Sequence, residues 1–190
     1  AFDDSIFDEP NGHRYVMSPA LRARGNPEAV WRALSNGVLQ SVGSDDAAYY
    51  EEFKTRGSSD FRLIANGVPG AQIRVPLLFS EGVLQGRISL DCFINATSTS
   101  PAQIFGLFPK KGAIMVGSDA DLVVYDDSEQ WIPDRKMMHT NIEYTLYESK
   151  TITGRPTHVW RRGEHVVAGS ELQVARGSGR FLERRKARNS

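Results

Sequence analysis

The stretch that most constrains the fold is an apolar-rich run that ends in two carboxylates. Val38–Val42 is typical of a buried strand, Gly43-Ser44 ends it, and Asp45 and Asp46 follow directly. In a parallel α/β barrel, the carboxyl ends of the strands form the mouth at which chemistry takes place. A carboxylate at that mouth can ligate a metal or act as a general base. The run therefore predicts a strand with Asp45 at a reactive end.

A helix and an earlier strand are predicted just before this run. Asn26-Pro27-Glu28 is typical of a helix start, with a capping residue, a proline in the first turn and an early acid. Asn36-Gly37 is typical of a helix end, and Arg14–Met17 is a short β-prone run. Residues 14–42 therefore predict a β-α-β unit with parallel strands.

The pattern changes after Phe108, from helical to alternating. Before this point, helices are predicted over residues 72–80, 89–96 and 100–105. After it, Leu122–Tyr125 predicts a short strand. Thr157–Arg161 and His165–Val167 predict a β-hairpin, with turns at Gly154 and at Arg162-Gly163. The C-terminal portion is therefore expected to be a small antiparallel module.

Composition limits the compartment and the partners. The 190 residues carry 23 basic and 23 acidic side chains, a balance that argues against a strongly charged partner. Cys92 is the single cysteine, which excludes an internal disulfide and makes a reducing, cytoplasmic setting the default. No apolar stretch approaches the roughly 20 residues of a membrane span. The chain begins at Ala1 without an initiator methionine, which indicates processing or a longer parent chain.

Eight segments, in order along nearly the whole chain, resemble the C-terminal part of the dihydropyrimidinase and D-hydantoinase family of cyclic amidohydrolases. They are Tyr15–Pro19, Val42–Asp45, Asn66–Gly70, Pro76–Val83, Thr97–Ala102, Ile104–Pro109, Gly117–Val124 and Gly179–Phe181. The Gly-Ser-Asp-Ala-Asp run in the seventh segment occurs across many amidohydrolases, whereas Asn-Gly-Val-Pro-Gly in the third is closer to this family.

The resemblance implies an α/β fold, namely the C-terminal part of a TIM-type (β/α)8 barrel plus strands of a small β-sandwich. It implies barrel over residues 1–108, sandwich strands over 109–176 and a basic tail over 177–190. The family's other metal ligands, a His-x-His pair, a carbamylated lysine and two more histidines, have no counterpart here. The four histidines of this chain, His13, His139, His158 and His165, show no metal-ligand spacing. An N-terminal segment or a second chain would therefore have to supply those ligands.

Three residues match functional positions of the family. Asp45 resembles its metal-ligating aspartate, which is also its general base, and the alternative is a turn aspartate after a strand. Ser18 and Asn66 match its substrate contacts, which hold a cyclic amide edge mainly through backbone groups; the alternatives are a pre-proline turn and a turn asparagine. Asp46 departs from the family, where His-Cys typically follows the catalytic aspartate. We expect Asp46 to point away or to cap the following helix.

The function implied is hydrolysis of a ring C–N bond in a hydantoin, dihydropyrimidine or related imide. A hydroxide held by two zinc ions would attack the ring carbonyl, and Asp45 would pass its proton to the leaving nitrogen. The main alternative is a non-catalytic adaptor with the same fold, and an allantoinase or dihydroorotase branch fits the Asn66–Gly70 segment less well. The basic tail lacks interleaved aromatic residues, so contact with a neighbouring subunit of a dimer or homotetramer is favoured over nucleic-acid binding.

Overall fold

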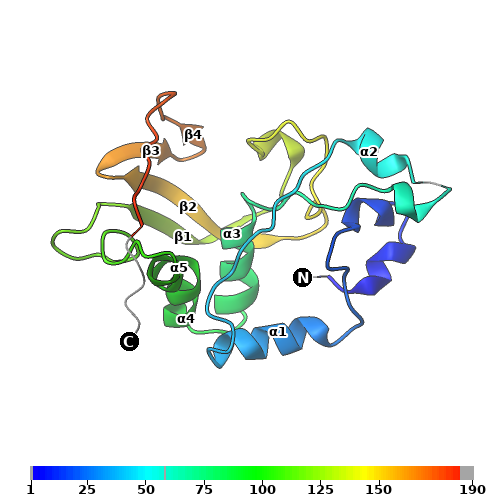
Figure 1. Ribbon diagram of the computed structural model, residues 1–190, viewed down its shortest axis with the longest axis horizontal. Helices are drawn as coiled ribbons and strands as arrows, with labels where there is room; N and C mark the ends of the chain where they lie inside the picture. Colours follow the sequence, from blue (N-terminus) through cyan, green and yellow to red (C-terminus); the bar gives the residue numbers. More distant parts are fainter. Residues whose placement is uncertain (1, 58, 185–190) are drawn as a thin grey trace.

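The computed structural model describes residues 2–57 and 59–184 and shows a sheet lying over a layer of helices (Figure 1). The α-helices are α1 (Asn26–Ser35), α2 (Glu51–Thr55), α3 (Arg74–Leu78), α4 (Leu90–Ile94) and α5 (Ser100–Ile104). The 3-10 helices are η1 (Asp4–Asp8), η2 (Gly12–Tyr15), η3 (Phe61–Leu63) and η6 (Arg135–Met137), and the π-helical turns are η4 (Phe79–Val83) and η5 (Asn95–Thr99). Among the residues described, no helix is both long and apolar enough to cross a membrane.

The sheet contains four antiparallel strands in the order β1-β2-β3-β4. They are β1 (Leu122–Trp131), β2 (Ile152–Arg161), β3 (Glu164–Ala168) and β4 (Glu171–Leu172). The predicted hairpin is confirmed, with Arg161 opposite Glu164 across its turn. The turn predicted at Gly154 is wrong, because Gly154 lies inside β2 with φ of 87°. A Cβ there would lie 3.0 Å from the rings of Phe79 and Tyr125, so glycine lets both rings pack against the strand.

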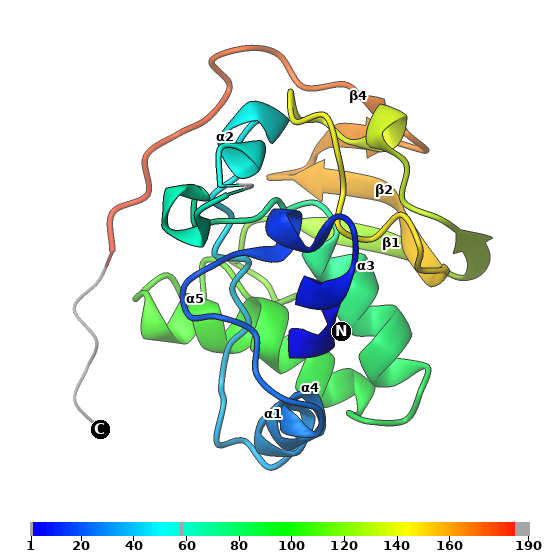
Figure 2. The ribbon, with the colours of Figure 1, turned by 90° about the vertical axis from the view of Figure 1, so that its right-hand side faces the viewer.

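The main core lies between α1, the α3–η4 helix and the α4–η5–α5 helix. Its buried members are Leu34, Leu78, Phe79, Ile88, Phe93 and Ala96. Tyr125 of β1 packs on this cluster from the sheet side, with its ring 4.7 Å from that of Phe79. Figure 2 shows α1, α3, α4 and α5 on one side of β1 and β2, which places this core between the two layers.

The helices predicted over residues 26–36, 72–80, 89–96 and 100–105 are all present, with two differences. Helix α3 continues without interruption into η4, although Pro76 lies inside it. The predicted helices at residues 89–96 and 100–105 form one run, because the π-helical turn η5 joins α4 to α5. The cap predicted at Asn26 is wrong, because Asn26 is the first residue of α1 and Gly25 is its N-cap. Helix α4 does have a side-chain cap: the Ser89 hydroxyl accepts a hydrogen bond from the Cys92 amide at 3.1 Å.

The two strands predicted at residues 14–17 and 38–42 are wrong. Residues 12–15 form η2, and residues 38–45 are irregular. A strand requires a neighbour to complete its ladder of hydrogen bonds, and within the described residues this part of the chain forms one isolated parallel bridge, between Asp46 and Val68. The fold class nevertheless stands, on the likeness to solved structures given below.

After β4 the described chain continues as an extended segment (Figure 2), in which Ser178 accepts hydrogen bonds from Arg161 and Arg162 at the β2–β3 turn. Phe181 in this segment is 91% exposed. The tail predicted over residues 177–190 is described as far as residue 184, and its last six residues lie outside the described part. The boundaries 1–108, 109–176 and 177–190 stay predictions.

Candidate functional site

Three irregular segments that carry the predicted site residues lie side by side. The Gly67 amide donates to the Val16 carbonyl at 3.1 Å, which joins residues 66–68 to residues 16–18. On the other side, Val68 forms the parallel bridge with Asp46, and its carbonyl accepts from the Ala47 amide at 3.2 Å. The segment at 66–68 is therefore the middle of three.

Ser18 and Asn66 are in direct contact. The Ser18 hydroxyl donates to Asn66 Oδ1 at 3.2 Å, across 48 residues of sequence. The Asn66 amide donates to the Ile64 carbonyl at 3.3 Å, which fixes the orientation of the side chain. Both residues are exposed, so the structure brings the two predicted substrate contacts together on an accessible edge.

Asp45 is exposed and has a left-handed backbone, with φ of 47°. This conformation is uncommon for a residue other than glycine, although aspartate adopts it more readily than most. Strained backbone of this kind concentrates at functional sites, where the surrounding structure holds it. The surroundings here are the neighbouring bridge between Asp46 and Val68, so the carboxylate of Asp45 leaves the chain at a fixed point beside the middle segment.

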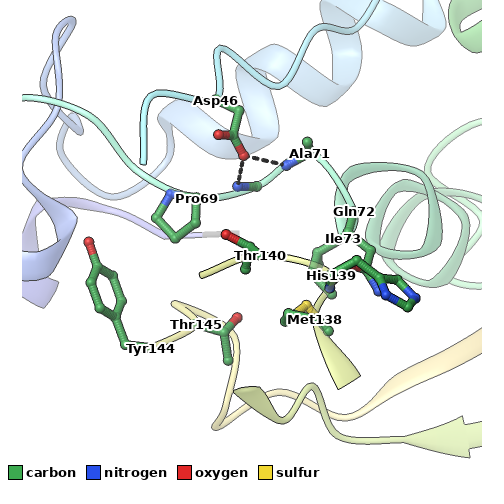
Figure 3. Close-up of a pocket in the computed structure, with 11 residues that line it drawn as sticks. Asp46, Pro69, Ala71, Gln72, Ile73, Met138, His139, Thr140, Tyr144 and Thr145 are labelled. Atoms are coloured by element: carbon green, nitrogen blue, oxygen red, sulfur yellow. Dashed lines mark hydrogen bonds between the residues drawn. The ribbon is translucent and has the colours of Figure 1, made fainter. Parts of the chain in front are cut away.

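Asp46 turns toward the chain that follows the middle segment. Its Oδ2 accepts hydrogen bonds from the Gly70 amide at 2.8 Å and the Ala71 amide at 2.9 Å (Figure 3). The helix that follows Asp46 in the chain is α2, but Asp46 bonds to the turn before α3 instead. The expectation that it caps the following helix is therefore wrong. Asp46 holds the turn that leads into α3.

Helix α2 joins the first segment to the middle segment through a buried lysine. Lys54 is fully buried, and its Nζ donates to the Val16 carbonyl at 2.9 Å and to the Ala65 carbonyl at 2.7 Å. Burial lowers the pKa of Lys54 to about 8, because the charged amine loses its hydration, while Glu51 acts in the opposite direction.

Glu51 at the start of α2 forms the principal ion pair near the site. Arg14 Nε donates to both carboxylate oxygens, at 3.1 and 2.9 Å, and His13 Nε2 lies 3.2 Å from Oε1. Burial alone would raise the pKa of Glu51, but the bonds from Arg14 and His13 outweigh it and hold the pKa below its ordinary value. The pair anchors η2 on α2.

A second apolar cluster, formed by Ile142, Tyr144 and Leu146, packs against Tyr15, Ala48 and Val68 of these segments. The Tyr144 hydroxyl donates to the Tyr49 carbonyl at 3.2 Å, and burial raises the pKa of Tyr144 to about 12. The Tyr15 hydroxyl donates to the Leu146 carbonyl at 3.0 Å. Residues 13–15, 49–54 and 142–146 are therefore tied into one unit.

A pocket of about 220 Å³ lies beside Asp46 (Figure 3). It is lined by Asp46, Pro69, Gly70, Ala71, Gln72, Ile73, Met138, His139, Thr140, Tyr144 and Thr145. Gln72 shapes one wall, because its side chain bonds to the Met137 carbonyl and the His139 amide. The three predicted site residues do not line this pocket, so it is a neighbour of the candidate site and a separate space.

Comparison with known families identifies the chain. The model of the amidohydrolase family matches residues 11–166, most of the chain. The chain belongs to the amidohydrolase family. The match spans both the three site segments and the sheet, so it applies to the candidate site as well as to the fold.

The amidohydrolase chain is similar to proteins named D-hydantoinase and dihydropyrimidinase. It is 42% identical to a D-hydantoinase of Geobacillus stearothermophilus over 97% of this chain and 40% of the relative, and 40% identical to one of Rhizobium radiobacter over the same shares. A crystal structure of a D-hydantoinase matches with a TM-score of 0.95 and 43% identity, over 98% of this chain and 41% of that one. The dihydropyrimidinase of Brevibacillus agri NCHU1002 matches with a TM-score of 0.93 and 40% identity, over 97% and 41%. These findings confirm the predicted resemblance and fold class, and the chain spans about 40% of the length of these relatives.

Among the described residues of this amidohydrolase chain, one side chain at the candidate site suits the role of a metal ligand. No cluster of three or more histidine, cysteine, aspartate or glutamate residues lies close enough to hold a metal within the described ranges. Asp45 offers an exposed carboxylate on a backbone that its neighbours fix, which suits a single oxygen ligand.

Sequence reasoning missed the residues that hold the site together. Glu51 and Lys54 belong to no predicted motif, yet Glu51 bonds to Arg14, 37 residues away, and Lys54 bonds to Val16, 38 residues away. Lysine is almost never fully buried, so no local pattern indicates this role. The one available signal was the spacing of Glu51 and Lys54 on one helix, and it does not reveal their partners.

Proposed function

We propose that this chain is the C-terminal portion of a metal-dependent enzyme that opens a cyclic amide or imide of the hydantoin or dihydropyrimidine type. The observation that carries the proposal is the joining of three segments: the segment of Asn66 lies between that of Asp45 and that of Ser18, and Ser18 bonds to Asn66. The likeness to proteins named D-hydantoinase over nearly the whole chain supports it.

Ser18 and Asn66 bind the substrate in this proposal. A ring –CO–NH–CO– unit presents acceptor, donor and acceptor groups along one edge, which backbone N–H and C=O groups of an exposed segment can pair with. The hydrogen bond between the two side chains holds the segments in register, so the edge is formed before the ring arrives.

In this proposal Asp45 transfers a proton from water to the ring nitrogen. A divalent metal, with zinc the one we propose, would activate water and polarise the ring carbonyl when bound. Asp45 would serve as one of its ligands, accept a proton and return it to the ring nitrogen as the C–N bond breaks. The left-handed backbone of Asp45 sets the point at which its side chain leaves the chain for both roles.

We further propose that an N-terminal segment or a second chain supplies the remaining metal ligands. The protein would be a dimer or tetramer. In this chain the barrel would cover residues 1–108, the sandwich strands 109–176 and the tail 177–190. Several apolar side chains are left uncovered at the sheet and at the loop that precedes it: Ile114 is 88% exposed and Val123 is 57% exposed. Large exposed apolar patches mark contact surfaces. Below, the assembled protein means this chain together with that remaining portion.

The test is hydrolysis of hydantoin and dihydrouracil by the assembled protein and by its Asp45→Asn variant. We expect turnover by the parent protein and a kcat lower by about 10²- to 10⁴-fold in the variant, because the amide can neither accept the proton nor ligate as a carboxylate. Asp127→Asn, an exposed aspartate on β1, serves as the matched control and should leave kcat unchanged. Near-normal turnover by Asp45→Asn would contradict the role of Asp45.

The adaptor alternative makes a different prediction. Intact mass spectrometry with metal analysis of the purified protein should show a portion with a His-x-His segment and a binuclear complement of zinc. A protein without metal that hydrolyses neither ring would favour the adaptor.

A further inference from the structure

Lys54 occupies an unusual position for a lysine. This residue of α2 is fully buried, whereas lysine side chains almost always reach water. A buried amine is retained only if its donors are used. Here the donors reach two backbone carbonyls, those of Val16 at 2.9 Å and Ala65 at 2.7 Å.

The two carbonyls flank the proposed substrate contacts. Val16 lies two residues before Ser18, and Ala65 directly precedes Asn66. The Val16 carbonyl also accepts from the Gly67 amide at 3.1 Å, so Lys54 and Gly67 share one oxygen. The amine therefore lies at the junction of the two segments.

The backbone of α2 also bonds to the chain directly before the middle segment. The Ala65 amide donates to the Phe53 carbonyl at 3.2 Å, next to the bond from Lys54 to the Ala65 carbonyl. Both backbone groups of Ala65 are thus bonded to adjacent residues of α2. Asn66 therefore comes directly after a residue that cannot shift unless α2 shifts too.

Ion pairing does not explain the position of the amine. Within the described residues, Lys54 Nζ has no carboxylate oxygen at ion-pair distance, and Glu51, one turn earlier, is engaged by Arg14 and His13. A leucine or methionine would fill the same space, so what the lysine adds is its N–H donors. These donors hold the carbonyls of Val16 and Ala65 at a fixed distance from each other.

We propose that Lys54 is a positioning residue that sets the separation of the Ser18 and Asn66 segments and thereby the fit of the substrate amide edge. The inference rests on the proposed function, because it takes Ser18 and Asn66 as the substrate contacts. Lys54 itself touches no reacting atom.

The first test compares Lys54→Met and Lys54→Arg in the assembled protein, with dihydrouracil as substrate. Methionine keeps the apolar stem and removes every donor, so KM should rise about tenfold while kcat changes less than about threefold, as expected when ground-state and transition-state binding weaken equally. Arginine restores donors, and its KM should lie between those of Lys54→Met and the parent protein. Lys110→Met, at an exposed lysine, is the control and should match the parent protein. A lower kcat at unchanged KM in Lys54→Met would overturn the proposal, because it would report loss of folded protein only.

The second test does not depend on activity. Hydrogen exchange of a peptide that covers residues 64–68 reports on the Gly67 amide, which bonds to the same Val16 oxygen as Lys54. We expect at least about tenfold faster exchange in Lys54→Met than in Lys54→Arg, since the shared acceptor is no longer held. Equal protection in the parent protein and Lys54→Met would overturn the inference. If the parent protein hydrolyses no ring, the proposed function fails, and this exchange result still decides whether Lys54 joins the segments.

Discussion

The β2–β3 hairpin and the segments around α2 both hold polar side chains in fixed places, but their contacts differ in range. In the hairpin, His158 Nδ1 lies 3.1 Å from His165 Nε2, seven residues away, across a turn formed by Arg162-Gly163. Around α2, the bond from Ser18 to Asn66 spans 48 residues, and that from Lys54 to Val16 spans 38. Strand pairing orders the hairpin, whereas side chains that bond to distant backbone groups order the site.

This difference has a consequence for how each region responds to change. A ladder contains many equivalent bonds, so one substitution removes a small part of the support. The site segments depend on a few particular groups: the Gly67 amide, the Lys54 amine, the Glu51 carboxylate and the Asp46 carboxylate. We therefore expect substitutions around α2 to cost more than matched substitutions in the sheet.

The largest contrast is expected between Gly67→Ala and Gly169→Ala. A Cβ on Gly67 would overlap the Ala47 carbonyl oxygen and lie 2.7 Å from the Ala47 Cβ, so two site segments would have to separate. We expect a loss of more than about 3 kcal/mol of unfolding free energy. Gly169, in the turn after β3, has φ of 61° and open space around it, so alanine there should cost about 1 kcal/mol. Thermal unfolding of the assembled protein measures both, and equal losses would remove the contrast.

The next effect is a pH dependence that arises from Lys54. Its folded pKa of about 8 lies below the ordinary value of 10.5, so between these values the unfolded chain binds more protons and stability rises with pH. The rise should total roughly 3 kcal/mol, and it should be absent in Lys54→Met. Urea unfolding of both proteins from pH 7 to 10.5 measures the difference, and subtracting the variant removes the tyrosine titrations near pH 10. Parallel curves would show that the amine is not desolvated.

The same difference in range explains what the sequence could predict. Pro27 lies in the first turn of α1, Gly37 follows its end, and Arg162-Gly163 joins β2 to β3, because helix ends and tight turns are encoded by neighbouring residues. Strands at 14–17 and 38–42 were predicted wrongly, because apolar runs of that length do not determine whether a partner strand lies alongside. Asp45, Ser18 and Asn66 were found through the family resemblance, and their roles stay predictions.

The burial of Lys54 could not be predicted, because its partners are the backbone carbonyls of residues that carry no distinctive side chain. Asp46 was expected to serve the helix next in the chain, which is the nearest set of free amide groups. The structure pairs it instead with Gly70 and Ala71, more than 20 residues later, because the parallel bridge from Asp46 to Val68 brings those amides closer.

A smaller effect is expected from Glu51→Gln compared with Glu164→Gln. Glu51 is partly buried and accepts both bonds from Arg14, so the loss of its charge should cost about 2 kcal/mol. Glu164 pairs with Arg161 in the hairpin and is 49% exposed on its side chain, so its loss should cost less than about 1 kcal/mol. Because the pKa of Glu51 is lowered, its contribution is present above the ordinary value of 4.5 and is lost as pH falls through the folded pKa. Acid unfolding curves of the parent and Glu51→Gln proteins should therefore converge at low pH, and curves that stay apart would contradict this assignment.

The smallest effect is expected from Asp46→Asn, compared with Asp126→Asn in β1. Each carboxylate accepts two backbone amides, but those of Asp46 belong to Gly70 and Ala71, whereas those of Asp126 belong to Ser128 and Glu129 close by in the strand. Asparagine keeps an acceptor oxygen and loses only the charge, so Asp46→Asn should cost about 1 kcal/mol or less. Hydrogen exchange should quicken over residues 69–72 in Asp46→Asn and only over residues 126–130 in Asp126→Asn. If the change in Asp46→Asn also reached residues 16–18, the three segments would have to be one cooperative unit, in which the carboxylate of Asp46 and the amine of Lys54 act together.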